Sequence, residues 1–536
     1  MKDDEMIKAL RPSGRRRGSG CKWRPYSRHW GAIFVSFWLA VGAISACAPP
    51  GRPPAAEADF GDGGEPGDPI SPAPPGIGQT DPNYRPRGLL SKSFYSSGRQ
   101  YAAMDFQTQH LAITFDVSSS KAIGRSTIRF QTTAAGRPYL LLEAPVLGAS
   151  ISGQTIAVEF LKDPDRLNSL VALEIELPAN DTRELIIEYE LPPGRASFAG
   201  GGVGFLSDMA DLTGRFFERY GPSSFEEDKF EMTLQLEVLN AKSEHRVFAN
   251  GSVEELSQTA WRIQYPREFT SSSFFVHLTN RALSVNEFEI QGRATKIPVV
   301  VYSTSASLVN QASRRLPALF RELERDFGPY PHLRFVAYMG TSSGGMEYAG
   351  ATITSLASLG HELLHSWFAR SVMPADGRSG WIDEAIARWR DLGYPRASRL
   401  LQRDPTQLGG LSRFQRSTPT NSYSDGASFL AELDLLFKDS GGLKAHLETF
   451  ARRYRYSLVT TDEFWWFLET SAQKNLNEFF SRYVFAGRPT QRVEGSLLPL
   501  ALVETNEDAL RQAEVREQHE SLHPTPLTDA ELSKLR

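Results

Sequence analysis

The sequence predicts an α+β protein of several domains, in which an N-terminal β-sandwich precedes a mostly helical domain with a small mixed sheet. Two patterns predict this division. Apolar and polar residues alternate between about residues 95 and 290, whereas helical spacing dominates from about residue 306 to residue 485. A chain of 536 residues is also longer than one hydrophobic core normally supports. The expected boundaries are 91–294 for the sandwich and 295–500 for the helical domain.

The composition is that of a globular protein. Hydrophobic residues make up 40% of the chain, charged residues 23%, and the formal net charge is −4. These values exclude a fully disordered chain, which has fewer apolar residues and a larger net charge. The charge balance also gives no sign of a nucleic-acid partner.

The N-terminal segment, residues 1–46, is predicted to be a signal peptide. It carries a net charge of +6, so the rest of the chain carries −10. The apolar run at 32–43 is shorter than the roughly 20 residues that span a bilayer. A basic start followed by a short apolar run is typical of an export signal.

The end of that segment, Ile44-Ser45-Ala46-Cys47, resembles a bacterial lipoprotein box. Cys47 would then be acylated and would anchor the protein to a membrane of the cell envelope. Ala48, in the next position, favours the outer membrane, on its periplasmic or its outer face. An uncleaved anchor or an incidental cysteine is the alternative interpretation. The other cysteine, Cys21, lies in the segment removed, so no disulfide is expected in the mature protein.

Two segments flank the predicted domains. Residues 47–90 are rich in Pro, Gly and acidic residues and have no apolar periodicity, so they are predicted to form an extended tether. Residues 501–536 are predicted to form a polar tail.

Short alternating segments predict the strands of the sandwich. They lie at 110–117, 126–130, 171–177, 184–191 and 230–239, and turn signals separate them.

The second domain is expected to begin with a strand at 297–302 and a helix at 306–327. Two further strands are expected at 333–339 and 351–354, and mostly helical structure after residue 356.

The chemistry of this domain is centred on His361-Glu362-Leu363-Leu364-His365. On a helix, positions i and i+4 share a face, so both imidazoles can bind one metal ion, and Glu362 can take a proton from metal-bound water. Two histidines also occur at this spacing on ordinary helices. A hydrolytic zinc site needs a third protein ligand, and Glu384 follows His365 after eighteen intervening residues, on a second expected helix.

This arrangement resembles the gluzincin zinc peptidases of the aminopeptidase N family, which include the leukotriene hydrolase. Gly344-Gly345-Met346-Glu347-Tyr348 is similar to the family's edge-strand motif, which has Asn in the last position. Tyr423, three positions before a glycine, is similar to the family's catalytic tyrosine. The resemblance covers about residues 95–490 and implies a thermolysin-like catalytic domain.

The resemblance implies a role for each of these residues. His361, His365 and Glu384 would hold one Zn²⁺ per chain. Glu362 would be the general base and Tyr423 would stabilise the oxyanion.

The edge-strand motif would bind the substrate. Glu347 would bind the free α-amine of a peptide or protein substrate, and the backbone of Gly344, Gly345 and Met346 would align the peptide. A glycine turn before a strand is the plain alternative for this stretch.

Several features depart from the family pattern. Tyr348 replaces the motif's Asn, and Ala385 follows Glu384 where the family has Gly. Tyr423 follows Glu384 by only 39 residues, and the family's large C-terminal helical domain is absent. The sandwich residue that often helps to bind the amine is not identifiable, since Glu218 is a poor candidate.

The sequence therefore predicts a tethered zinc metallopeptidase, in the first place an aminopeptidase. A non-catalytic binding or assembly lipoprotein that retains the zinc fold is the main alternative. Hydrolysis of another amide or an epoxide, and endopeptidase activity, also stay open.

Overall fold

The computed structural model describes residues 92–161, 170–209, 217–225, 228–340, 344–375, 377–401, 403–409, 418–487, 490–493 and 496–499. The predicted signal peptide, Cys47, the tether up to residue 90 and the polar tail lie outside these residues. Within the described part of the chain, no helix has the length and apolar character needed to cross a bilayer.

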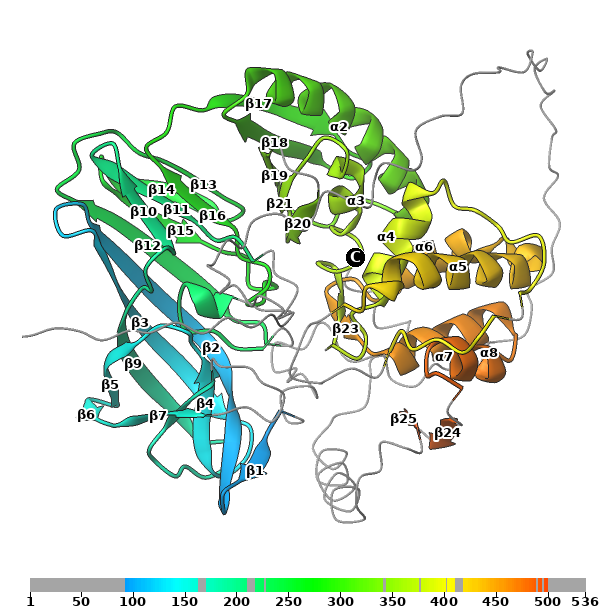
Figure 1. The fold of residues 1–536 in the computed structure, drawn as a ribbon, viewed down its shortest axis with the longest axis horizontal. Coiled ribbons are helices and arrows are strands. Elements are labelled where there is room, and N and C mark those ends of the chain that lie inside the picture. Colours follow the sequence, from blue (N-terminus) through cyan, green and yellow to red (C-terminus); the bar gives the residue numbers. More distant parts are fainter. Residues whose placement is uncertain are drawn as a thin grey trace, which may run out of the picture. The chain divides into compact units, whose positions relative to one another are not determined.

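The first part of the described chain consists almost entirely of strands (Figure 1). Its larger sheet has twelve strands, eight of them in the order β14-β15-β12-β2-β3-β9-β5-β6. The long central strands alternate buried and exposed residues, as expected for a sheet with one face in a core. The strands are β1 Phe94–Ser96, β2 Arg99–Asp116, β3 Lys121–Thr132, β4 Arg137–Leu141, β5 Val146–Ile151, β6 Gln154–Thr155, β7 Val158–Leu161, β8 Leu170–Leu173, β9 Thr182–Glu190, β12 Glu231–Leu239, β14 Ser252–Ser257 and β15 Ala260–Gln264.

A second sheet packs against the first. It has the order β10-β11-β16-β13, from Ala196–Ala199, Gly202–Leu206, Val276–Thr279 and Arg246–Ala249, and a short 3-10 helix lies at Phe217–Arg219. The two sheets share one hydrophobic core, in which Phe115 of β2 and Phe205 of β11 have ring centroids 5.2 Å apart.

The second part is mixed α/β. Its five-stranded sheet has the order β17-β18-β19-β21-β20, from Ser284–Gln291, Lys296–Ser303, Phe335–Met339, Ala351–Thr354 and Gly345–Tyr348. The three central strands are parallel, and β17 and β20 are antiparallel edges. Helix α2, Ala306–Phe327, connects β18 to β19 as a crossover and has the bounds predicted from the sequence. Ser305 caps its N-terminus by accepting a hydrogen bond from Leu308 N.

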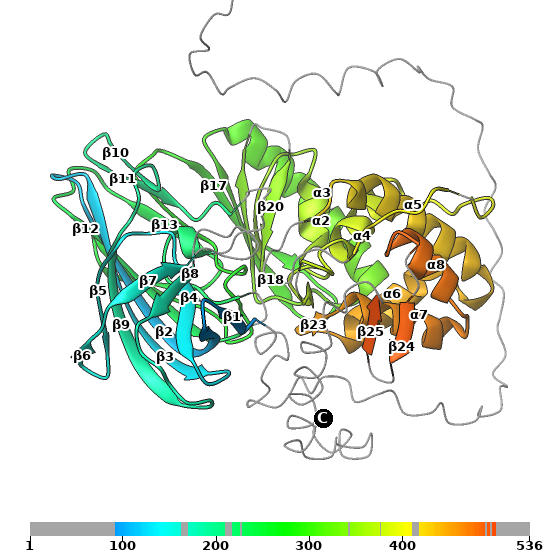
Figure 2. The same cartoon turned by 60° about the horizontal axis from the view of Figure 1, so that its bottom comes forward.

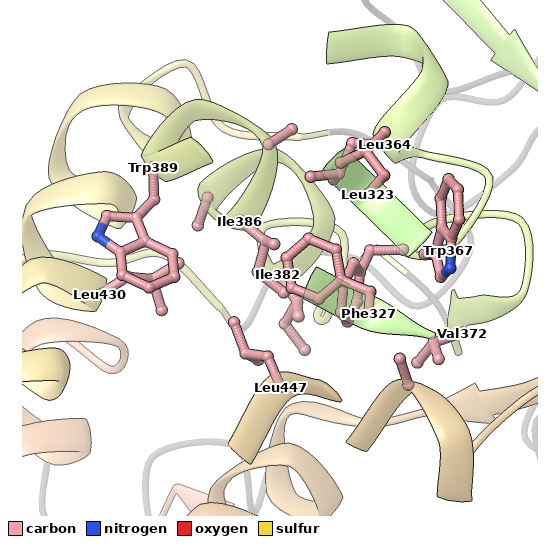
Figure 3. Packing of buried hydrophobic residues seen from close by; sticks show 14 of the residues in the cluster. Leu323, Phe327, Leu364, Trp367, Val372, Ile382, Ile386, Trp389, Leu430 and Leu447 are labelled. Atoms are coloured by element: carbon pink, nitrogen blue, oxygen red, sulfur yellow. The ribbon is translucent and has the colours of Figure 1, made fainter. Parts of the chain in front are cut away.

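The remaining helices follow the sheet and are grouped together in Figure 2. They are α3 Leu359–Leu364, α4 Ile382–Asp391, α5 Asn421–Leu436, α6 Leu443–Arg453, α7 Thr461–Ala472 and α8 Asn477–Tyr483, with a 3-10 turn at Lys438–Ser440. Two further sheets have two strands each. In one, β22 Val372–Pro374 pairs with β23 Ser457–Val459, and in the other, β24 Thr490–Val493 pairs with β25 Ser496–Pro499. Their common core gathers Phe327 of α2, Ile382 and Ile386 of α4 and Leu447 of α6 (Figure 3).

Two sequence predictions need correction. The third alternating segment, 171–177, is a strand only to Leu173. The helix of the two histidines ends at Leu364, so His365 is its C-cap residue, still in helical conformation. The glycine stretch before residue 351 forms the edge strand that the resemblance implied, since Gly345–Tyr348 is strand β20.

The packing of this core predicts that removal of one buried aromatic ring lowers the free energy of unfolding. Phe320 of α2 is fully buried and packs edge-on against Tyr330 and Phe335. Phe320→Ala is expected to lower the free energy of unfolding by about 3–5 kcal/mol, because it leaves a cavity. Leu333→Ala, at a side chain that is 77% exposed, is the control and should change it by less than about 0.5 kcal/mol. Denaturant unfolding measures the free energy of unfolding of both variants. Equal losses in the two variants would contradict the buried position of Phe320.

Candidate active site

Helices α3 and α4 bring the three predicted metal ligands together. His361 Nε2 lies 3.1 Å from Glu384 Oε2, and His365 Nε2 lies 3.6 Å from the same oxygen. One ligand atom from each residue lies within 4.8 Å of those of the other two. Glu384 follows His361 by 23 positions and His365 by 19 positions along the chain, so the packing of the two helices creates the cluster.

The spacing fits a zinc ion. Zinc binds imidazole nitrogen and carboxylate oxygen at about 2.0–2.2 Å in a tetrahedral arrangement, which places two ligand atoms roughly 3.3 Å apart. The separations of 3.1 Å and 3.6 Å lie on either side of that value. Two imidazoles and one carboxylate also leave the fourth position open, as a catalytic zinc site requires.

Hydrogen bonds fix both imidazole rings. His365 Nδ1 is 3.0 Å from the carbonyl oxygen of Phe368, and His361 Nδ1 is 2.7 Å from Asp391 Oδ2. Each Nδ1 can donate to its oxygen, so each Nε2 presents its lone pair to the ligand cluster. A second carboxylate behind a metal-binding histidine typically raises metal affinity, because it orients the ring and increases its basicity.

Asp391 is a residue that the sequence reasoning missed. It lies seven residues after Glu384 on α4, so both carboxylates share one face of that helix. Arg390 donates to Asp391 Oδ1 and makes two bonds of 2.9 Å to Glu322 of α2. The i, i+7 spacing from the third ligand was the available signal in the sequence.

The charges in the site shift the pKa values of its metal-free residues. Burial alone would lower the pKa of His361, but the hydrogen bonds to Asp391 and Glu384 outweigh it and raise the pKa to about 11. Burial would likewise lower the pKa of His365, but the charges of Glu347 and Glu384 raise it to about 9. Burial would raise the pKa of Glu384, and the two imidazoles hold it well below its usual range. Metal binding should therefore release protons from the histidines.

Glu362 is buried beside the ligands and beside strand β20. Burial is the largest cause that raises its pKa, to about 8, although His361 and His365 act against it. The backbone of Gly345 lies directly against this carboxyl group, because a Cβ on Gly345 would be 2.5 Å from Glu362 Cδ and Oε1. The glycine of the edge-strand motif therefore leaves room for the predicted base.

Tyr423 reaches the same site from α5. Its ring is nearly parallel to that of His361, with centroids 6.3 Å apart, and the side chain is 38% exposed. Burial and then the charge of Glu384 raise its pKa, so the hydroxyl stays protonated and able to donate. Gly426 permits this approach, since a Cβ there would lie 2.7 Å from Ala385 Cβ on α4.

The edge-strand motif borders this cluster. Ligand oxygens of Glu347 and Glu362 and a ring nitrogen of His365 lie within 4.8 Å of one another. Glu347 is buried and accepts a hydrogen bond of 2.9 Å from Arg370 Nη2, a partner that the sequence did not indicate. Among the described strands, β20 pairs only with β21, so its other edge has no strand partner there.

Other motif residues have structural partners. Gly344 has a positive φ of 92°, a conformation that favours glycine, at the start of β20. Met346 is half-buried, and its carbonyl oxygen accepts a bond from Thr352 Oγ1. Tyr348, in place of the expected Asn, donates to Ser207 O and accepts from Met209 N in the first part of the chain. This substitution therefore ties the edge strand to the β-rich part.

Asp391 predicts a test of the ligand cluster. Asp391→Asn removes the carboxylate behind His361 and is expected to weaken zinc affinity about 10–100-fold. Competition with a coloured zinc chelator measures this on folded protein. Asp439→Asn, at an exposed position of the 3-10 turn after α5, is the control with unchanged affinity. Equal affinity of both variants and the parent would show that Asp391 does not support the metal.

Comparison with known proteins supports the same fold. No family model and no curated protein matches the chain. A two-domain M1 zinc metallopeptidase, solved as a mutant with bound L-tryptophan, is 18% identical, with 69% of this chain and 93% of that chain covered and a TM-score of 0.52. Leukotriene A4 hydrolase from Saccharomyces cerevisiae is 12% identical, with 79% and 73% covered and a TM-score of 0.54. Legionella pneumophila aminopeptidase A is 14% identical, with 74% and 50% covered and a TM-score of 0.58.

These likenesses concern the fold, because all three identities are low. They confirm the resemblance that the sequence motifs indicated. The chain therefore has the fold of the M1 zinc metallopeptidases, the group that contains the aminopeptidase and the leukotriene A4 hydrolase named above.

Proposed function

We propose that this protein is a zinc-dependent metallopeptidase, and specifically an aminopeptidase, built from a β-sandwich and a thermolysin-like catalytic domain. The observation that carries the proposal is the convergence of His361, His365 and Glu384 at zinc-ligand spacing, with Glu362 and Tyr423 beside them. The fold neighbours, among them a zinc metallopeptidase and an aminopeptidase, support the peptidase class.

The three ligand residues would hold Zn²⁺, which when bound polarises a carbonyl and makes water a stronger acid. Glu362 takes the proton from the attacking water and later delivers it to the leaving amine. Burial of this carboxyl group beside the ligands raises its pKa, which favours a group that carries a proton.

Tyr423 and the edge strand act on the substrate. The protonated hydroxyl of Tyr423 donates to the oxygen on which negative charge develops. The backbone of Gly344, Gly345 and Met346 pairs with the peptide as an added strand, since the outer edge of β20 has no neighbour among the described strands. Glu347 binds the α-amine, which places the scissile bond one residue from the N-terminus.

We also propose that acylated Cys47 anchors the enzyme to the cell envelope, with residues 48–90 as the tether. Metabolic labelling with a palmitate analogue should mark the parent protein and not Cys47→Ser. Labelling of both would place the lipid elsewhere.

The reaction can be tested with aminoacyl-4-nitroanilides and N-blocked peptides on the full chain, with and without a zinc chelator. Chelator-sensitive cleavage of free-amine substrates is expected. Glu362→Gln should lower kcat at least 10³-fold while one zinc per chain is retained, because only the proton carrier is lost. An unchanged rate in this variant would refute the mechanism, and one bound zinc without any turnover would favour a binding lipoprotein.

Gly345 gives a second, geometric test. Gly345→Ala places a methyl group against the carboxyl group of Glu362, which must move. We expect kcat to fall by about 10²-fold with zinc retained, because small displacements of a catalytic group are costly. Gly148→Ala is a matched control, since a Cβ there meets nothing within 4 Å and its φ is not positive. Steady-state kinetics and metal analysis measure both, and full activity of Gly345→Ala would contradict the position assigned to Glu362.

A further inference from the structure

A buried arginine joins three separate segments beside the site. The side chain of Arg370 has no exposed surface. Its Nη2 donates to Glu347 Oε1 at 2.9 Å, and its Nη1 donates to Ser272 Oγ at 2.6 Å. Glu347 lies on β20, Arg370 follows the two metal-binding histidines, and Ser272 lies in the buried turn between β15 and β16.

The backbone before Arg370 is held in an unusual conformation. Ala369 has a φ of 115°, which is rare for a residue with a side chain, and it is fully buried. Ala369 N donates to Val372 O at 2.9 Å, and Arg370 N donates to His365 O at 3.0 Å. Strain of this kind persists only where the surroundings enforce it, and it is concentrated at functional sites. Here it follows directly on the metal-binding segment and directs Arg370 to Glu347.

The ion pair has a definite effect on Glu347. A buried carboxylate and a buried guanidinium are each costly, and a pair is tolerated when good hydrogen bonds satisfy both. The charge-assisted bond from Arg370 Nη2 fixes the direction of Glu347 Oε1. The fixed carboxylate lies within 4.8 Å of Glu362 and His365, at the edge of the reacting centre.

We propose that Arg370 and Ser272 are positioning residues for substrate selection. Ser272 holds the guanidinium, the guanidinium orients Glu347, and the oriented carboxylate binds the free α-amine of a peptide. This deepens the proposed function and rests on it. It also makes the choice of unblocked peptides depend on Ser272, a residue of the β-rich part of the chain.

The test measures binding, so that it does not need turnover. The parent is the zinc-loaded full chain with Glu362→Gln. Calorimetry compares trialanine with N-acetyl-trialanine, and the parent is expected to prefer the free amine at least tenfold. Adding Arg370→Gln should reduce this preference to less than threefold, with one zinc per chain still bound.

The serine turn provides a matched pair. Ser272→Ala removes a hydroxyl that touches Arg370 and should reduce the preference at least threefold. Ser271→Ala removes the neighbouring buried hydroxyl, which accepts from Ser224 N, and should leave the preference unchanged. The two serine variants test the positioning role even if Arg370→Gln does not fold, because neither of them breaks the ion pair between Arg370 and Glu347.

The outcomes separate the two proposals. Equal binding of the two peptides by the parent would overturn the amine subsite. A preference in Ser272→Ala and Arg370→Gln that equals the preference of the parent would overturn the positioning role of these two residues. Loss of the preference in these variants would support the subsite. If the wild-type chain also hydrolyses no substrate, the subsite stands and only the peptidase reaction is refuted.

Discussion

The contact between helices α3 and α4 is the constraint on which the rest of the site depends. It places Glu384 Oε2 at 3.1 Å and 3.6 Å from the two imidazoles. The same helix α4 also carries Asp391, which holds His361 from the other side. The apolar faces of both helices lie in one core with α2, so packing energy rather than local sequence keeps these three side chains together.

The electrostatics of the site follow from this crowding. Glu347, Glu362 and Glu384 lie around His361 and His365 in a buried region, where like charges interact strongly. The repulsion between the three carboxylates is relieved in a different way at each of them. Glu384 is paired with the imidazoles and stays ionised, Glu347 is paired with Arg370, and Glu362 has a raised pKa. Different surroundings thus give three similar side chains the different roles of metal ligand, amine anchor and proton carrier that we propose.

The described residues of the β-rich part are connected to the site by hydrogen bonds. Tyr348 bonds to Ser207 and Met209, Asn250 Nδ2 donates to Ala349 O at 2.7 Å, and Arg370 donates to Ser272. The bonds of Tyr348 and Asn250 lie at the C-terminal end of the edge strand, and the bond of Ser272 reaches Glu347 of that strand through Arg370. They connect β20 to the β-rich part, whereas Tyr423 is partly exposed to solvent.

The sequence by itself determined the division into a strand-rich and a helix-rich part, the bounds of α2, and the candidate residues for the metal site that we propose. These depend on local periodicity and on short spacings such as that of His361 and His365. Only the tertiary structure decided that Asp391 supports His361, that Gly426 lets α5 approach Ala385, and that Arg370 and Ser272 hold Glu347. These partners lie up to 98 positions apart. Apart from the i, i+7 spacing of Glu384 and Asp391, no periodic pattern links them, because their contacts arise when whole helices and sheets pack.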